Sequence, residues 1–311
     1  MLPREALRVC VIGPGRLGLT LVASLRQSGI AVPAVVASPA VPLDPTADPP
    51  RLSLSEAVAQ ADVVWITVPD DGIEGVAHDV AAALAPTTAS PATTETTAFP
   101  ATPPERPLAA IHSSGLGSLD LLAPLRGVAA GILSLHPLQS FAAPGDAGAL
   151  RDVPMAVTGD TPADVEFGRW LAERLGCRPF ALTDDAKPLY HLAAASASNL
   201  FVALQSEAGE LMAAAAGLPP AAAACLLAPL VATTAANIAA RGPSQALTGP
   251  VARGDVGTVR AHLELLAGQA PRFADTYRSL SLQALHLAAP RLDDDTVRAL
   301  HELLDRREGR P

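Results

Sequence analysis

One lysine stands among the 22 basic residues of this 311-residue chain, and residues able to do chemistry follow it. Lys187 lies in the stretch "DDAKPLYHLAAASASNL" (184–200), which also holds His191, Ser198 and Asn199. In a helix of about 100° per residue, Lys187, His191 and Ser198 share one face, with Asn199 on its flank. A helix start and partial burial both lower a lysine pKa toward the range useful for general acid–base catalysis. We therefore predict Lys187, His191 and Asn199 as catalytic residues and Ser198 as a substrate-binding residue; the alternative is that the single lysine reflects chance.

Four further polar residues are candidates for binding a substrate. His112 ends the strand at the start of "LAAIHSSG" and is followed by Ser113, and His136 ends the strand in "GILSLHPLQSF". Because parallel strands end at one edge of a sheet, both histidines should lie at the edge that binds ligands, although a single histidine at a strand end is usually structural. Arg253, in the loop "LTGPVARGD", could hold a substrate carboxylate through two hydrogen bonds, or could belong to a plain turn. The three histidines His112, His136 and His191 lack the local spacing of metal ligands, so no metal is predicted.

The N-terminal segment "VIGPGRLG" predicts a dinucleotide site. It supplies Gly13, Gly15 and Gly18 in GxGxxG spacing, after a predicted strand and before a predicted helix, with Arg16 and Leu17 between them. In such a site the first glycine makes the tight turn, the second lets the backbone approach a pyrophosphate, and the third lets the helix pack on the strand. The start of the helix then faces the anion.

The second strand indicates which nicotinamide cofactor the site binds. NAD-binding chains usually carry an acid about 20 residues after the first glycine, but Ala37, Ser38 and Pro39 occupy this region. The missing carboxylate permits a 2′-phosphate, so we predict NADP, with NAD as the alternative and Arg16 or Arg51 as the nearest cations. Val68 and Pro69 follow the third strand and should line the cofactor cleft, whereas Asp70 and Asp71 are expected to cap the next helix.

Strands and helices alternate over the first part of the chain. Strand-like runs occupy residues 7–12, 31–37, 61–68, 107–115, 127–137, 153–159 and 178–182. This alternation predicts an α/β, Rossmann-like, doubly wound parallel sheet over 1–183, interrupted by a disordered Thr/Pro-rich insertion at 85–107. After 183 only helices are expected, at about 186–216, 219–240, 255–267, 270–288 and 293–307. Residues 184–311 should thus form an all-α domain for substrate binding and dimerisation.

Composition excludes several classes of partner. The formal net charge is −9 and only 3% of residues are aromatic, which argues against nucleic-acid binding. Three scattered cysteines and the absence of a signal-peptide pattern indicate a cytoplasmic protein. The uncharged segment from Leu211 to Ala240 has the length of a membrane span, but its alanines and prolines favour buried helices or a subunit interface.

These motifs together resemble a bacterial family of Rossmann-like NAD(P)-binding oxidoreductases whose C-terminal half is a domain of unknown function. The stretches that carry the resemblance are "VIGPGRLG", "ITVPDDGI", "HSSG", "SLHPLQSF", "KPLYHLAAASASNL" and "LTGPVARGD". More distantly, the chain is similar to ketopantoate reductase, pyrroline-5-carboxylate reductase, prephenate dehydrogenase and the 6-phosphogluconate and β-hydroxyacid dehydrogenase superfamily. The resemblance implies a dinucleotide-binding domain followed by a helical domain that forms a homodimer.

The resemblance also implies an activity. In several of those enzymes a lysine on the first helix of the second domain is the acid–base group, with an asparagine one turn later. Lys187 matches the lysine, but His191 stands one turn later, so either Lys187 or His191 could transfer the proton. We therefore expect an NAD(P)H-dependent oxidoreductase that reduces a small carbonyl acid, with 2-dehydropantoate as the first substrate to consider. The alternatives are a non-catalytic NADP-binding sensor or structural protein, and an imine or prephenate-type dehydrogenase.

Overall fold

The chain forms two compact units, Met1–Ser198 and Asn199–Pro311. The structure is a computed structural model that describes residues 6–44, 48–85 and 108–305. The insertion predicted at 85–107 lies outside the described residues beyond Ala85. The division after Ser198 falls later than the predicted boundary at 183, because the helix that begins at Lys187 bonds to the sheet of the first unit.

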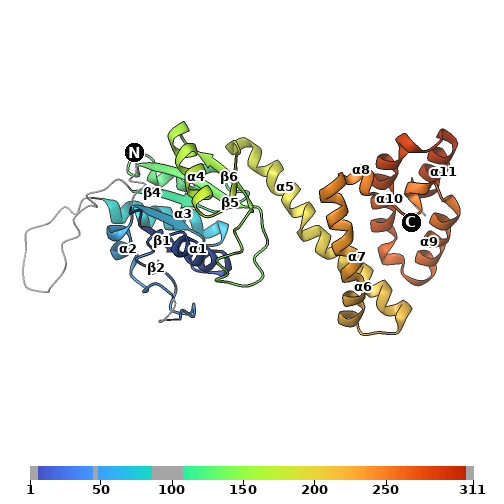
Figure 1. Cartoon of the computed structure of the whole chain (residues 1–311), viewed down its shortest axis with the longest axis horizontal. Helices are drawn as coiled ribbons and strands as arrows, with labels where there is room; N and C mark the ends of the chain where they lie inside the picture. Colours follow the sequence, from blue (N-terminus) through green and yellow to red (C-terminus); the bar gives the residue numbers. More distant parts are fainter. Residues whose placement is uncertain (1–5, 45–47, 86–107, 306–311) are drawn as a thin grey trace, which may run out of the picture. The chain divides into compact units, whose positions relative to one another are not determined.

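The first unit is built on a seven-stranded sheet (Figure 1). Its strands are β1 (Val9–Ile12), β2 (Val35–Val36), β3 (Val63–Ile66), β4 (Ala109–His112), β5 (Gly131–Pro137), β6 (Pro154–Gly159) and β7 (Arg178–Ala181), in the order β2-β1-β3-β4-β5-β6-β7. Residues Val9–Ile12, Val63–Ile66 and Ala109–His112 are buried throughout, as expected for strands covered on both faces.

Helices cover both faces of this sheet. They are α1 (Arg16–Gln27), α2 (Leu54–Gln60), α3 (Asp70–Leu84) and α4 (Pro162–Arg174), with the 3-10 turn η1 (Leu119–Leu125). After β7 come the 3-10 turn η2 (Asp184–Ala186) and helix α5 (Lys187–Ala197), of which only Lys187 is buried. Leu21 of α1 and Leu171 of α4 join one core cluster with alternate strand residues such as Val11. Ile73 of α3 and Leu122 of η1 join a second cluster on the opposite face. The predicted doubly wound architecture is therefore confirmed.

The sheet departs from the prediction at one strand pair. The strands from β2 to β5 are parallel, but β6 pairs antiparallel to β5, and β7 is parallel to β6. The segment 138–153 between β5 and β6 contains no helix. A parallel neighbour would need a crossover to the opposite end of the sheet, usually through a helix. Because no helix is present here, the chain reverses direction after β5 and β6 runs antiparallel to it. The sheet is mostly parallel rather than wholly parallel.

The second unit is helical. Its helices are α6 (Asn199–Ala216), α7 (Pro220–Arg241), α8 (Pro243–Ala246), α9 (Val256–Gln269), α10 (Ala274–Ala288) and α11 (Asp294–Asp305), with the 3-10 turns η3 (Val251–Arg253), η4 (Pro271–Phe273) and η5 (Ala289–Arg291). Val259 of α9, Leu285 of α10 and Leu300 of α11 meet in its core. The single helix predicted at 186–216 is wrong in one respect: it is interrupted at Ser198, whose φ of −119° departs from the helical value of about −63°.

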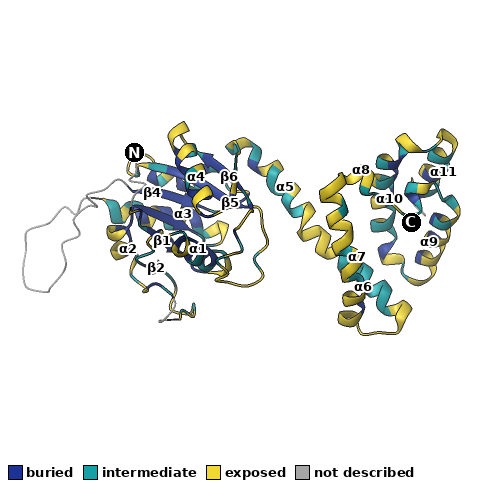
Figure 2. Ribbon diagram, viewed as in Figure 1, coloured by how far each residue is buried: buried dark blue, intermediate teal, exposed yellow. Residues whose placement is uncertain are grey.

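Helix α7 buries little of its apolar surface within the chain. Only Ala223 of this 22-residue helix is buried, and Figure 2 shows α6 and α7 in the intermediate and exposed colours. Within the described residues, α7 is the one helix whose length and mean hydropathy of 1.7 suit a membrane span, and 6% of that apolar stretch is buried. A core helix of a soluble protein would be mostly buried, so α7 requires another explanation.

Candidate functional site

The glycine loop of residues 13–18 is packed against the start of the loop that follows β3. Gly13 has a φ of +87°, and an added Cβ would lie 2.6 Å from Cγ1 of Val68. At Gly18 an added Cβ would lie 2.6 Å from the carbonyl oxygen of Gly13 and 2.7 Å from Oγ1 of Thr67. The Thr67 hydroxyl donates to that same carbonyl oxygen at 2.7 Å. Two of the three predicted glycines are thus required by the packing of the protein itself.

Gly15 differs from its neighbours, because nothing lies within 4 Å of where its Cβ would be. It is exposed and precedes the first residue of α1, whose N-terminus has no side-chain cap and no acidic residue in its first turn. The protein alone does not need a glycine here, but a pyrophosphate approaching the backbone would. The open cradle at an uncapped helix start therefore fits a dinucleotide.

The surroundings of the glycine loop hold the other predicted cofactor residues. Arg16 is exposed at the helix start, whereas the Leu17 side chain packs partly against the core. Val68 touches Gly13, as its predicted place in the cofactor cleft requires, and Pro69, exposed, precedes α3. Asp70 does not cap α3 by a side-chain bond, contrary to expectation; it takes up another partner described below.

A cation lies beside the loop that follows β2. Ser38 is exposed there and accepts a hydrogen bond from the backbone N–H of Ala40. The Arg51 guanidinium donates to the carbonyl oxygen of Val41 at 2.6 Å, and the Arg51 backbone bridges to Val35 of β2. This is the region in which Rossmann domains recognise the ribose 2′ position. The residues present therefore fit a 2′-phosphate.

Lys187, the first residue of α5, extends into the sheet of the first unit. It is 1% exposed. Its Nζ donates to Oγ of Ser134 on β5 at 2.5 Å and to the backbone carbonyl of Ser114 at 3.1 Å. In the sheet, Ser134 of β5 lies opposite His112 of β4, and His112 lies opposite Ile66 of β3. Ile66 lies opposite Ile12 of β1, the residue that precedes the glycine loop. Three strand spacings, about 14 Å, therefore separate the lysine's partner from the start of that loop.

The charge of Lys187 is poorly compensated. Among the described residues, no carboxylate lies within ion-pair distance of its Nζ. Burial lowers the pKa of Lys187 from 10.5 to about 8, and the charges of Asp184 and Asp70 oppose that shift only in part. A buried cation without an ion pair costs stability, and such groups concentrate at functional sites.

The loop "HSSG" (112–115) provides the surface above this lysine. His112 is fully buried; its Nδ1 accepts a hydrogen bond from the backbone N–H of Ser114, and burial, with the charges of Lys187 and His136, lowers its pKa to about 3. Ser113 accepts a 2.8 Å bond from the indole of Trp65. Ser114 donates to Oδ2 of Asp70 at 2.6 Å. His112 and Ser113, predicted to bind substrate, thus hold the loop in place.

His136 and His191 meet at Gly115. An added Cβ on Gly115 would lie 2.9 Å from Nε2 of His136 and 3.0 Å from Cδ2 of His191, so the absence of a side chain lets the two rings approach. Both histidines are partly exposed. Within the ranges that the structure describes, no three His, Cys, Asp or Glu side chains are grouped to hold a metal ion. The charge of Lys187 is among the causes that lower the pKa of His136, so the pair lies close to the buried ammonium.

Three predicted residues are not brought to this surface by the structure of the first unit. Ser198 is exposed at the far end of α5, about 16 Å along the helix axis from Lys187. Asn199 begins α6, and Arg253 lies in η3; both belong to the second unit. Their assignments therefore remain predictions from the sequence.

Sequence reasoning missed three residues that the structure joins to this cluster: Ser134, Asp70 and Tyr190. Ser134 lies two residues before His136 within an apolar run, and a period-two pattern could have placed both on related positions of one strand. Asp70 was interpreted as a helix cap. Tyr190, one residue before His191, bonds to His136 across 54 positions of sequence, which no local pattern could reveal.

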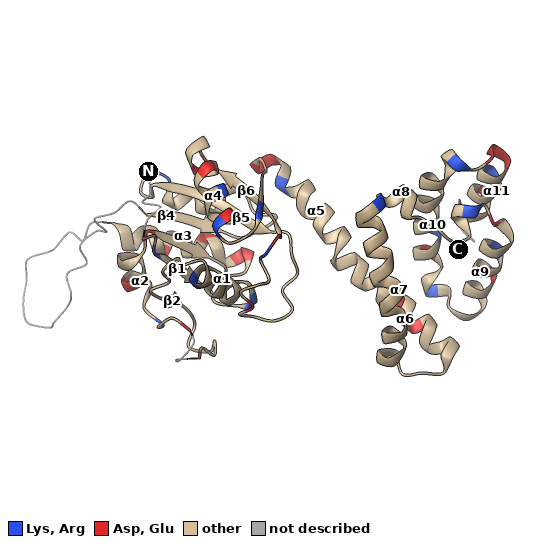
Figure 3. Cartoon of the chain, in the orientation of Figure 1, with Lys and Arg blue, Asp and Glu red and all other residues tan. Residues whose placement is uncertain are grey.

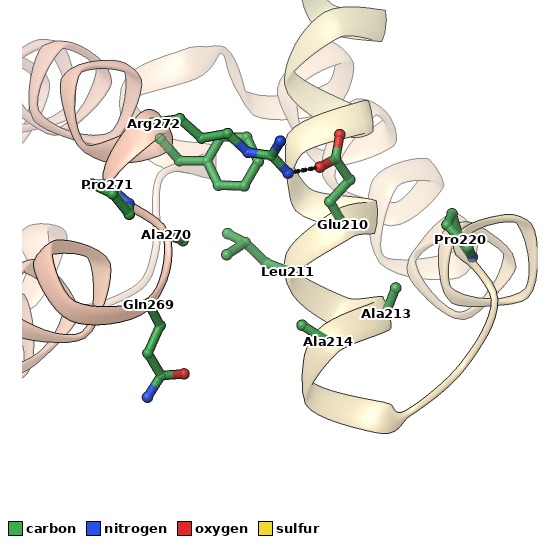
Figure 4. Close-up of a pocket in the computed structure, with 10 residues that line it drawn as sticks. Glu210, Leu211, Ala213, Ala214, Pro220, Gln269, Ala270, Pro271 and Arg272 are labelled. Atoms are coloured by element: carbon green, nitrogen blue, oxygen red, sulfur yellow. Dashed lines mark hydrogen bonds and ion pairs between the residues drawn. The ribbon is translucent and has the colours of Figure 1, made fainter.

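A pocket in the second unit holds none of these residues. It lies between α6 and η4, where Glu210 and Arg272 form an ion pair (Figure 4). Most of its remaining lining is alanine, proline and leucine, with Gln269 as a further polar side chain. The one carboxylate of this lining, Glu210, is paired with Arg272, and the lining holds no histidine or lysine, so the candidate site is the cluster in the first unit.

Comparison with known proteins supports the fold. Residues 153–284 match the model of a domain of unknown function, DUF2520. A Bacteroides fragilis protein named as a candidate NADP oxidoreductase has a similar structure, at 19% identity and a TM-score of 0.65 over 91% of this chain and 99% of its own. Protein TM1727 from Thermotoga maritima is similar at 22% identity and a TM-score of 0.63, over 91% and 99%.

A third similar structure contains a cofactor. Pyrroline carboxylate reductase from Plasmodium falciparum, with NADP bound, matches at 11% identity and a TM-score of 0.56, over 96% of this chain and 100% of its own. No curated protein matches the sequence. The chain thus has the Rossmann fold of NAD(P)-binding oxidoreductases, together with a segment that matches DUF2520.

Proposed function

We propose that this protein is an NADPH-dependent reductase of a small carbonyl acid, with 2-dehydropantoate as the first substrate to test. The observation that carries the proposal is Lys187: a buried ammonium that has no ion pair among the described residues, near two histidines, at the sheet edge that also bears the glycine loop. Sites of this kind stabilise negative charge that develops during a reaction. A bound reduced nicotinamide would supply the hydride.

The burial of Lys187 supports a role through its charge. Its ammonium favours the negative charge that forms on the substrate oxygen when the carbonyl carbon is reduced. His191, one turn along α5 and partly exposed, gives the proton to that oxygen and regains one from solvent. His136 contacts the substrate from the sheet side. Arg253 would hold the substrate carboxylate, as the sequence pattern predicts, whereas Ser198, about 16 Å along α5 from Lys187, is too far away to touch the same small substrate.

A panel assay tests this function. Purified protein is given NADPH or NADH with 2-dehydropantoate, other small 2-keto acids, a cyclic imine acid and prephenate, and the loss of reduced cofactor is followed. Turnover of a keto acid supports the proposal, and turnover of the imine or prephenate alone would move the enzyme to the alternative reductase class. Tight NADPH binding with no turnover of any substrate would favour the sensor or structural role.

Arg51 is expected to contribute to NADP preference. Changing it to Gln removes the cation that is bonded to the loop after β2, where a 2′-phosphate would bind, so the Kd for NADPH should rise about tenfold, while the Kd for NADH stays within about twofold. Fluorescence titration of both cofactors measures the two constants. Arg298→Gln, on the exposed face of α11, is the matched control and should change neither. Equal losses for NADPH and NADH would exclude this role of Arg51.

We further propose a cytoplasmic homodimer formed through α6 and α7. Helix α6 exposes Leu200 and Val202, and α7 exposes Leu226, Leu230 and Ile238. Helix α7 carries no charge before Arg241 (Figure 3). An uncharged apolar face can pair with its own copy without like-charge repulsion, which a symmetric interface requires. Light scattering with size-exclusion chromatography should give the mass of a dimer without detergent, and Leu230→Glu should give a monomer. Wild-type protein that needs detergent to stay in solution would indicate a membrane partner instead.

A further inference from the structure

His136 has a partner that the proposed function does not use. The hydroxyl of Tyr190, on α5, lies 2.6 Å from Nδ1 of His136, and the two rings meet edge to face at 86° with their centroids 5.5 Å apart. Phe180 of β7 packs against the other side of Tyr190, with a centroid distance of 6.0 Å. The phenol is therefore held between a strand and the imidazole, and its hydroxyl is aimed at one ring nitrogen.

The other ring nitrogen of His136 faces outward. Nε2 lies beside Gly115 and His191 and has no hydrogen-bond partner within the described part of the chain. The only buried side-chain nitrogen or oxygen without a partner in that part is Nε2 of His112. Nε2 of His136 is not among those buried atoms and has no partner within the described residues, so it reaches solvent beside Gly115.

The donor in the short bond follows from the chemistry of the two groups. Burial raises the pKa of Tyr190 to about 12, so the phenol keeps its proton. Its oxygen is a weak acceptor and its O–H a good donor, and no other acceptor for that proton is present among the described residues. An imidazole nitrogen accepts strongly, so Tyr190 donates to Nδ1, and the proton of neutral His136 must be on Nε2.

The charged surroundings keep His136 neutral. Burial, then the charges of Lys187 and His191, lower its pKa to about 4, and Asp70 opposes them weakly. His112 on the neighbouring strand β4 also faces this cluster and is itself uncharged near neutral pH. With Tyr190, these are the titratable groups that face His136 from β4, α3 and α5.

We propose that Tyr190 is a positioning residue that holds His136 as a neutral imidazole with its N–H at Nε2, aimed at the substrate. His136 then gives a hydrogen bond to a substrate oxygen and transfers no proton. The contact with substrate rests on the proposed reductase function, whereas the tautomer of His136 does not.

The direct test is the side-chain ¹⁵N spectrum of the histidines in full-length protein. Wild-type His136 should show a protonated Nε2 and an unprotonated Nδ1 from pH 8 down to about 5, without titrating. In Tyr190→Phe the fixed tautomer should give way to a mixture, and the midpoint of the His136 titration should rise by at least about one pH unit, because the donor that favoured the neutral form is gone. A wild-type His136 protonated on Nδ1, or titrating near its ordinary value, would overturn the proposal.

The second unit offers a matched control. Tyr277 bonds to Nδ1 of His262 at 2.9 Å, with the rings edge to face and 5.7 Å apart. Tyr277→Phe removes the same kind of hydroxyl and should alter the signals of His262 while leaving those of His136 unchanged. Changes at His136 in this variant would show that the signals report general loosening rather than the Tyr190 contact.

Kinetics give the second arm. On the substrate found by the panel, Tyr190→Phe should lower kcat/KM about tenfold near pH 7, with an added loss at lower pH as His136 becomes protonated. Tyr277→Phe should leave kcat/KM within about twofold of the wild-type value, both near pH 7 and at lower pH. If the wild-type spectrum shows the fixed tautomer but no substrate is turned over, the positioning role of Tyr190 stands and the reductase function is wrong. If Tyr190→Phe leaves turnover unchanged at all pH values, Tyr190 has no role in catalysis.

Discussion

Replacing Lys187 with methionine is expected to make the protein more stable and to lower its reductase activity at least about 100-fold. Methionine has a similar length and no charge, so it fills the buried position without the cost of an unpaired ammonium. The shift in pKa from 10.5 to about 8 corresponds to at most about 3 kcal/mol of that cost. The variant also loses two hydrogen bonds of Lys187, which contribute about 1 kcal/mol each and offset part of this gain in stability. The free energy of unfolding near pH 7 should therefore rise by about 1 kcal/mol.

The effect of Lys187 on the free energy of unfolding should depend on pH. Below about pH 8 the lysine is protonated in both the folded and the unfolded chain, and the folded state carries the full cost. Between about 8 and 10.5 the unfolded chain binds more protons than the folded one, so the Lys187 contribution makes stability rise with pH. The methionine variant should lose this rise. Wild-type activity should fall as pH increases through about 8, because the ammonium that stabilises the substrate oxygen becomes neutral.

Denaturant unfolding at several pH values and the kinetic assay measure both halves of this prediction. Arg298→Met is the control, because its exposed ion pair with Asp295 should be worth under about 1 kcal/mol and lies outside the candidate site. A Lys187→Met protein that is less stable at pH 7 yet fully active would show that the lysine is structural. A stable variant with little activity would support the electrostatic role.

Replacing Gly15 with alanine is expected to abolish most dinucleotide binding without unfolding the protein. No atom of the protein lies within 4 Å of the new methyl group, so the melting temperature should change little. The methyl group would occupy the space in which the backbone approaches a pyrophosphate, so the Kd for NADPH should rise at least about tenfold. Calorimetric titration and thermal unfolding on the same samples separate the two effects.

Two other glycines serve as controls for this experiment. Gly75→Ala, on the exposed face of α3, also meets no atom within 4 Å and should leave NADPH binding unchanged while stabilising the helix slightly. Gly18→Ala should instead destabilise the fold by about 2 kcal/mol or more, because its methyl group would press on Gly13 and Thr67. If Gly15→Ala binds NADPH as tightly as the wild type, the loop does not hold the pyrophosphate.

Local patterns were sufficient for the architecture of the first unit. Short apolar runs alternate with helical segments, and buried parallel strands require such runs because helices cover both faces. The glycine spacing likewise depends on contacts between neighbouring segments, because Gly13 and Gly18 are needed where the start of α1 packs against the loop that contains Thr67. By contrast, the antiparallel β6 could not be predicted, because the direction of a strand depends on the path of the loop before it.

The sequence by itself determined the Rossmann-like fold, the glycine loop and the position of the single lysine, Lys187, since each depends on residue types at short spacing. Only the tertiary structure decided what Lys187 contacts and how the histidines divide their roles. His112 and His136 both end predicted strands, yet one is fully buried and bonded to its own loop, and the other reaches the surface with Tyr190 behind it. Burial and partners, which set a pKa and select a tautomer, come from segments distant in sequence, so local patterns could not supply them.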